Sequence, residues 1–275
     1  MNDDTTPGNP LSRILVVLDP SAETRSLLDY AAELAAELGV PLVGVFVEDT
    51  DIAEFAELPF AREICISAGT VRALSRQRMQ SYFRAEAARL RRALEAAGRA
   101  RRISCSFELR RGRVETELAA IVQDRDLIAI APGFGTVVRA RDHDILGRLS
   151  GSAAAGFLAF SQRRVVRDGI LAVFTGSPES ERAVALGATI AGRRGVPLRV
   201  VVAGPALEPA MGEAVQRLAR GVDRVEVMAG EGRVADMLRT LVPPPQMVVL
   251  PADLSGDELK RIRKLDLPLL VIRRT

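Results

Sequence analysis

The sequence is poor in the residues on which metal centres and disulfide-rich folds depend. Its 275 residues include no tryptophan, one histidine, two cysteines and two lysines, and 4% are aromatic. Cys65 and Cys105 form no C-x-x-C pair, which argues against a zinc site or a disulfide framework. His143 has no second histidine or cysteine nearby to complete a metal site. We therefore expect an aliphatic core and no metal centre.

Long apolar runs are absent as well. No uncharged apolar stretch reaches the roughly 18 residues that a membrane helix needs, and the polar start MNDDTTPGNPLS has no apolar signal-peptide segment. We expect a cytoplasmic protein with no membrane partner, because two unpaired cysteines suit a reducing compartment. The net charge of +3 comes from 38 basic and 35 acidic residues mixed along the chain. A nucleic-acid partner is therefore not expected.

The chain does contain an internal repeat. With 48% hydrophobic residues it can bury a large core. Residues 13–47 align with 169–203 at an offset of 156, and residues 112–130 align with 232–250 at an offset of 120. The first copy therefore carries 36 extra residues. This predicts a domain over 12–162, with a long inserted connection and helix at 49–100, and a shorter, degenerate domain over 168–275.

Each copy alternates short apolar runs with amphipathic segments, as buried parallel strands and their connecting helices do. The expected strands are Ile14–Leu18, Leu42–Val47, Ile103–Leu109, Leu127–Ala131 and Phe157–Phe160, then Ile170–Phe174, Leu198–Ala203, Val225–Met228, Met247–Leu250 and Leu267–Ile272. The expected helices include 21–38, Val71–Ala97, Val114–Gln123 and Glu179–Arg194. This order predicts an α/β fold whose parallel sheets carry helices on both faces.

Ligands of such sheets bind beyond the carboxyl ends of the strands, where the strand order reverses. Asp19 ends the first strand of the first copy. Its carboxylate can accept hydrogen bonds from a base or a ribose, or it can share with Ser21 the capping of the next helix. The matching residue of the second copy is Thr175, so this charge is expected to be absent there.

A glycine-rich stretch, APGFGTVVRARDHDILGRLSGS, follows the fourth strand of the first copy. Its candidate phosphate-binding residues are Gly133, Gly135, Gly147, Gly151 and Ser152. Glycine permits a close backbone approach to phosphate oxygens, and free N–H groups at a helix start favour an anion. A flexible turn is the alternative. The second copy has a single glycine in its matching loop and no expected phosphate site.

These features resemble a tandem universal stress protein, from Arg13 to Arg273. The resemblance rests on the strand ending in Asp19, on SAETRSLLDYAAELAAELGVPL, VFVED and GRVETELAAIVQDRDLIAIA, and on the glycines that follow. It implies doubly wound five-stranded sheets in the order 3-2-1-4-5 and an intrachain pseudo-dimer joined through the last strands. It also implies adenine-side contacts at Asp19 and Val47.

The sequence departs from the nucleotide motif of that family, G-x-x-G followed by nine residues and G-[S/T]. Counted from Gly133, Thr136 takes the second glycine position, and counted back from Gly151, Arg141 takes it. ATP or another adenine nucleotide is therefore expected to bind weakly or not at all, and only in the first domain.

Three functions stay open from the sequence. The first is a non-enzymatic stress-response or regulatory protein that binds a nucleotide or anion at a divergent site in domain one, with domain two as structural partner. The second is an ATP-binding or ATP-hydrolysing enzyme, although a nucleophile–base pair and a P-loop motif are both missing. The third is partner binding, or homodimer formation, through the arginine-rich helix at 72–102, whose interleaved acids also suit a solvated face.

Overall fold

The computed structural model describes residues 11–21, 23–65, 69–131, 154–160, 168–203, 209–230, 232–265 and 267–273. Its main strands are β1 (Arg13–Leu18), β2 (Leu42–Asp49), β5 (Cys105–Gly112), β6 (Asp126–Ile130), β7 (Gly156–Ala159), β8 (Ile170–Phe174), β9 (Leu198–Ala203), β10 (Val225–Gly230), β11 (Met247–Pro251) and β12 (Leu269–Ile272). They form one ten-stranded sheet in the order β10-β9-β8-β11-β12-β7-β6-β1-β2-β5.

The sheet consists of two halves with the same strand order. Numbered within each half, β5-β2-β1-β6-β7 and β10-β9-β8-β11-β12 both read 3-2-1-4-5. The pairings inside each half are parallel, whereas β7 and β12 pair antiparallel, with Leu158 opposite Leu270. The expected α/β fold and the joining of the halves through their last strands are therefore confirmed. This pairing removes an exposed edge from each half.

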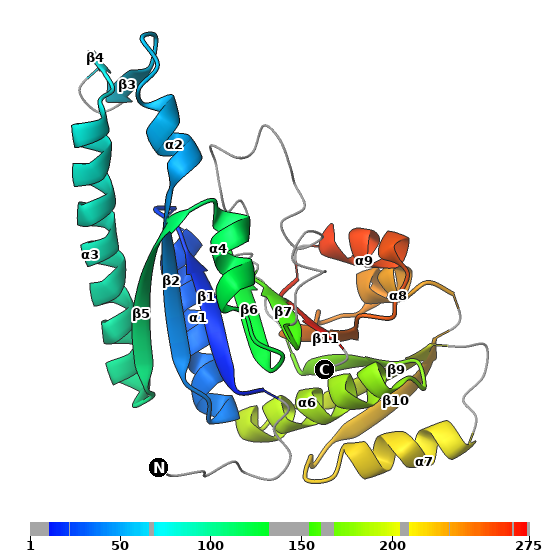
Figure 1. Ribbon diagram of the computed structural model, residues 1–275. Helices are drawn as coiled ribbons and strands as arrows, with labels where there is room; N and C mark the ends of the chain where they lie inside the picture. The colour runs from blue at the N-terminus through cyan, green and yellow to red at the C-terminus, as the bar shows by residue number, and fades with distance from the viewer. Residues whose placement is uncertain are drawn as a thin grey trace.

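Helices cover both faces of the sheet (Figure 1). They are α1 (Glu23–Leu38), α2 (Thr50–Phe55), α3 (Arg76–Arg101), α4 (Val114–Ile121), α6 (Pro178–Arg194), α7 (Pro209–Leu218), α8 (Val234–Thr240) and α9 (Gly256–Arg263). On one face, side chains of α1, α3, α6 and α7 share a single apolar cluster that spans both halves. On the other face, α4 covers one half and α8 and α9 cover the other, in two separate clusters.

The inserted connection of the first half differs from the expected one. The helix predicted over Val71–Ala97 begins instead at Arg76, where Ser75 caps it. Thr70–Ala73 form strand β4, which pairs antiparallel with β3 (Arg62–Cys65), and α2 precedes this hairpin. Backbone pairing between segments this short leaves no apolar period in the sequence, so the prediction extended the helix too far. We call residues 50–75 the arm.

The arm projects from the body beside the first turns of α3 (Figure 1). It exposes large apolar side chains at Phe55, Leu58, Phe60 and Val71, and the rings of Phe55 and Phe60 lie 6.4 Å apart in an edge-on arrangement. Two of these exposed apolar side chains, Phe55 and Phe60, are therefore in contact on the surface of the arm.

Two glycines lie at the contact between helix α3 and the sheet, one in β2 and one in α3. A Cβ atom at Gly44 of β2 would lie 2.7 Å from Leu94, and one at Gly98 of α3 would lie 2.6 Å from the sulfur of Cys105. A larger residue at either position would require these neighbouring side chains to shift. The predicted apolar stripe of this helix, from Phe83 to Ala97, is buried as expected.

A polar cluster joins the halves on the face shared by α1 and α6. Arg194 of α6 donates to both carboxylate oxygens of Glu37 in α1, at 2.8 and 3.1 Å, and to the side-chain oxygen of Gln246 at 3.3 Å. Its guanidinium also lies 5.7 Å from the ring centre of Tyr30, within range of a cation–π contact. The Tyr30 hydroxyl is buried, finds no hydrogen-bond partner at normal distance among the described residues, and lies close to the Arg194 guanidinium; burial raises its pKa to about 12, against the lowering effect of Arg194.

Candidate functional site

The expected ligand edge of the first half is present at the point where the strand order reverses. β1 lies between β2 and β6, so the carboxyl ends of β1 and β6 adjoin at this edge. Asp19 follows β1 there. The glycines and serine predicted to hold phosphate, at 133, 135, 147, 151 and 152, lie outside the described residues.

Asp19 is fixed by three hydrogen bonds to a single carboxylate oxygen. Oδ1 accepts from the Ser21 backbone N–H at 3.1 Å, from the Ser21 hydroxyl at 2.5 Å and from the Thr24 hydroxyl. The carboxylate therefore orders the turn into α1, as an N-terminal capping group does. Asp19 is only 7% exposed, and within the described part of the chain it has no ion-pair partner. The capping role and a ligand-facing role are compatible, because Oδ2 takes no part in these bonds.

Val47 lies in β2, and its side chain is part of the core. It is 7% exposed and belongs to the cluster that Val17, Val45 and Ile130 form beneath α4. Val47 is two residues before Asp49, the last residue of β2. The structure thus brings Asp19 and Val47 to neighbouring strands, with the Val47 side chain already packed.

The matching edge of the second half contains a carboxylate that the repeat alignment did not indicate. The Thr175 hydroxyl donates to Asp253, in the loop after β11, at 2.8 Å. Position 175 itself carries no charge, and a neighbouring loop places the Asp253 carboxylate beside it. Glu258 of α9 accepts a hydrogen bond from the backbone N–H of Ala235 at 2.8 Å and so caps α8. The polar groups at this edge thus form hydrogen bonds with other groups of the second half.

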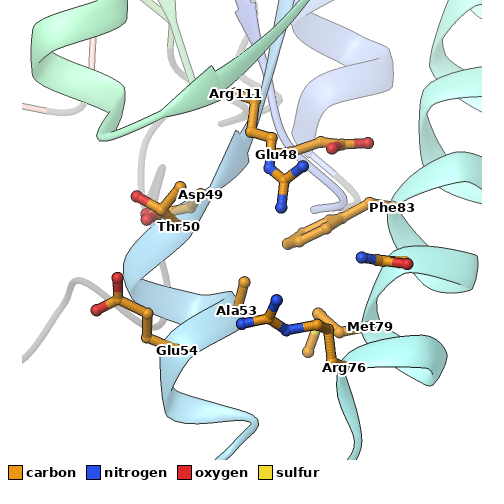
Figure 2. A pocket seen from close by; sticks show the side chains of 10 residues that line it. Glu48, Asp49, Thr50, Ala53, Glu54, Arg76, Met79, Phe83 and Arg111 are labelled. Carbon is orange, nitrogen blue, oxygen red and sulfur yellow. The ribbon is translucent and has the colours of Figure 1, made fainter.

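A small cavity lies at the carboxyl ends of β2 and β5, between α2 and the first turns of α3. Its volume is about 110 Å³. Figure 2 shows the guanidinium groups of Arg111 and Arg76 turned toward it, with the ring of Phe83 at its side. Asp49 caps α2 by accepting from the Asp51 backbone N–H at 2.9 Å, and burial raises its pKa.

Sequence reasoning missed this cavity. The available signal was the pair of charged strand ends, Glu48-Asp49 and Arg110-Arg111, which lie side by side in the β2–β5 ladder. Only the placement of the arm over them makes a cavity. Among the described residues, including those around this cavity, no group of three or more His, Cys, Asp and Glu side chains is placed to hold a metal ion. No helix in the described ranges is long and apolar enough to cross a membrane.

Most arginines of α3 are engaged in local contacts. Arg89 pairs with Glu86, Arg99 with Glu95, Arg101 with Asp29 and Arg76 with Glu57, while Arg91 lies over the ring of Phe107. Pairs of this kind on an exposed helix contribute a few tenths of a kcal/mol each. They are typical of a solvated outer face.

Comparison with known proteins supports the fold at two levels. The family model described as the universal stress protein family matches residues 10–152. A universal stress protein from Archaeoglobus fulgidus has a similar structure, with a TM-score of 0.68 at 15% identity, over 95% of this chain and 96% of that chain. A protein of unknown function from Pseudomonas aeruginosa gives a TM-score of 0.55 at 18% identity, over 96% and 92%.

No protein of the curated set is matched by sequence. The likeness to the solved structures extends over both halves and shows the tandem fold. The family match covers more than half of the chain, including Asp19, Val47 and the glycine-rich stretch. The chain therefore belongs to the universal stress protein family.

Proposed function

We propose that this chain is a non-enzymatic regulatory protein of the family, with one weak nucleotide-type or anion site in its first half. The site would lie at the carboxyl edge beside Asp19, and the glycine-rich stretch after β6 would complete it. The second half serves as the structural partner that pairs through β12. Asymmetry between the halves is central to this proposal.

The observation that carries the proposal is the state of Asp19. A buried carboxylate is normally paired or fully hydrogen-bonded. Asp19 is 7% exposed, its hydrogen bonds from the described residues all reach Oδ1, and no described cation pairs with it. Held in this way, its second oxygen can accept hydrogen bonds from the N–H or O–H groups of a base or ribose without any rearrangement of the turn.

The second half supports the asymmetry. There the hydroxyl of Thr175 is bonded to Asp253 and to Ser177, and the N-terminus of α8 is capped by Glu258. A ligand at that edge would have to replace bonds that the protein already makes. We therefore assign the ligand to the first half alone.

Calorimetric titration with ATP, AMP and inorganic phosphate tests the proposal. We expect weak binding of at least one adenine nucleotide to the intact chain and a loss of about tenfold or more in Asp19→Asn, since a hydrogen bond to a charged group contributes about 1.5–3 kcal/mol. Asp253→Asn is the matched control and should bind as the unaltered protein does. Phosphate release from ATP should stay at the level of a protein-free blank.

Two results would contradict the assignment. Nucleotide affinity that depends on Asp253 and not on Asp19 would move the site to the second half. ATP turnover above the blank that is lost in Asp19→Asn would instead favour the enzyme. Circular dichroism of both variants verifies that each retains the fold.

A further inference from the structure

We propose that the cavity between the arm and α3, here called the arm cavity, is a second binding site, for a small zwitterion of the size of an aliphatic amino acid. It lies over β2 and β5, on the far side of β2 from β1 and Asp19. The proposal does not depend on nucleotide binding at the first site.

The arm cavity exists because the first half carries the insertion. In the first half, 26 residues separate the end of β2 from the start of α3, and α2 and the β3–β4 hairpin lie within them. In the second half, five residues separate β9 from α7. The wall formed by α2 therefore has no counterpart there. The cavity shares the carboxyl edge of the sheet with the ligand sites of open α/β folds, but lies one strand away from the point where the strand order reverses.

The charges around the arm cavity match a ligand that carries both signs. Arg111 is the register partner of Glu48 across the ladder, yet in the described structure neither forms an ion pair. Figure 2 shows the Arg111 guanidinium turned into the cavity, and Arg76, which pairs with Glu57, reaches it from α3.

The full set of lining charges is two arginines and three carboxyl groups, those of Glu48, Asp49 and Glu54. A ligand with only a negative charge would meet two guanidinium groups but also a surplus of carboxylates. A ligand with only a positive charge would leave Arg111 unpaired. A zwitterion matches the charges of both signs, since its carboxylate can accept hydrogen bonds from Arg111 and its ammonium group can donate to Glu48.

The rest of the lining combines the polar side chains of Thr50 and Gln80 with an apolar part, and the space is small. Ala53, Met79 and Phe83 line it, and Phe83 is 6% exposed and held edge-on against Phe46 at a ring distance of 6.3 Å. The volume of about 110 Å³ is far below the roughly 300–1,000 Å³ of pockets for drug-sized ligands. A nucleotide does not fit, whereas a short aliphatic side chain can pack against Phe83.

Three probes of similar shape test the charge requirement in the full-length protein. L-leucine carries both charges, isocaproate carries only the carboxylate and isoamylamine carries only the ammonium. We expect L-leucine to raise the Tm of the protein and to bind in calorimetry, because a ligand specific to the folded state stabilises it. We expect each single-charge analogue to bind at least about tenfold more weakly, since it lacks a charge-assisted hydrogen bond.

Variants locate the site. Arg111→Gln should weaken L-leucine binding by about tenfold or more, whereas Arg92→Gln, at an exposed arginine of α3 outside the arm cavity, should leave it unchanged. Asp19→Asn should also leave it unchanged, which separates this site from the proposed nucleotide site. The proposal is overturned if L-leucine fails to bind at millimolar concentration, if isocaproate binds as well as L-leucine, or if Arg111→Gln and Arg92→Gln behave alike.

Discussion

Replacing Arg194 with methionine should destabilise the whole chain, because this side chain connects the two halves. Arg194 donates two parallel hydrogen bonds to Glu37, and the two side chains are 10% and 13% exposed. Removing one partner of a buried ion pair costs about 3–5 kcal/mol. Since both side chains retain some solvent contact, we expect the lower end of that range, about 3 kcal/mol.

The stability lost in Arg194→Met should be smaller at acidic pH than at neutral pH. Burial raises the pKa of Glu37, while the hydrogen bond and charge of Arg194 lower it. The folded state therefore holds the Glu37 proton more tightly than the unfolded chain does, and stability falls as pH rises through the window above the ordinary glutamate pKa. Without Arg194 the pKa of Glu37 in the folded state should rise further, so that Glu37 is protonated up to a higher pH. The stability lost in Arg194→Met should therefore become smaller as the pH falls toward the ordinary glutamate pKa.

Chemical unfolding followed by far-ultraviolet circular dichroism measures these free energies, and the chain has no tryptophan for fluorescence. The control is Arg193→Met, because Arg193 is exposed and adjoins Arg194 in the same helix turn. A double variant, Arg194→Met with Glu37→Gln, should recover part of the loss, since it leaves no unpaired buried charge. If Arg194→Met and Arg193→Met unfold alike, or if the deficit grows as the pH falls, the reasoning is refuted.

Four further outcomes can be measured by the same unfolding assay. Tyr30→Phe should be neutral or stabilising by up to about 1 kcal/mol at neutral pH, because it removes a buried hydroxyl that has no hydrogen-bond partner among the described residues; a clear loss would mean that this hydroxyl does donate to a neighbour. Because the pKa of Tyr30 is raised to about 12, the same variant should lose less stability than the unaltered protein between pH 10 and about 12. Gly156→Ala should destabilise by about 1–3 kcal/mol, since its Cβ would lie 2.5 Å from a β12 carbonyl oxygen, whereas Gly212→Ala, with open space around it in α7, should stabilise by about 0.5–1 kcal/mol. Asp126→Asn should cost about 3 kcal/mol or more, because Asp126 is fully buried and accepts two hydrogen bonds from Arg13; equal stability of the two proteins would show that this pair contributes nothing.

The repeat and the apolar periodicity predicted the alternating strands and helices of both halves. Buried parallel strands such as Ile14–Leu18 and Ile170–Phe174 are apolar throughout, and that pattern is local enough to be recognised without a structure. The two aligned blocks indicated that both halves share one order of elements, whereas the strand order 3-2-1-4-5 and the pairing of the last strands were expected from the resemblance to the universal stress protein family. The apolar pattern placed Asp19 at the end of the first strand, and the strand order that the resemblance implied placed that end at the reversal.

The arm, the arm cavity and the contacts between halves were decided by tertiary structure. The β3–β4 hairpin is too short to show a period, and Asp253 reaches Thr175 from 78 residues away. Arg194 and Glu37 are 157 residues apart. Such contacts depend on how elements pack rather than on the local order of residues, because side chains from distant strands and helices meet only once the sheet has formed. Periodicity identifies strands and helices, whereas the partners of an individual charged side chain are determined by packing in three dimensions.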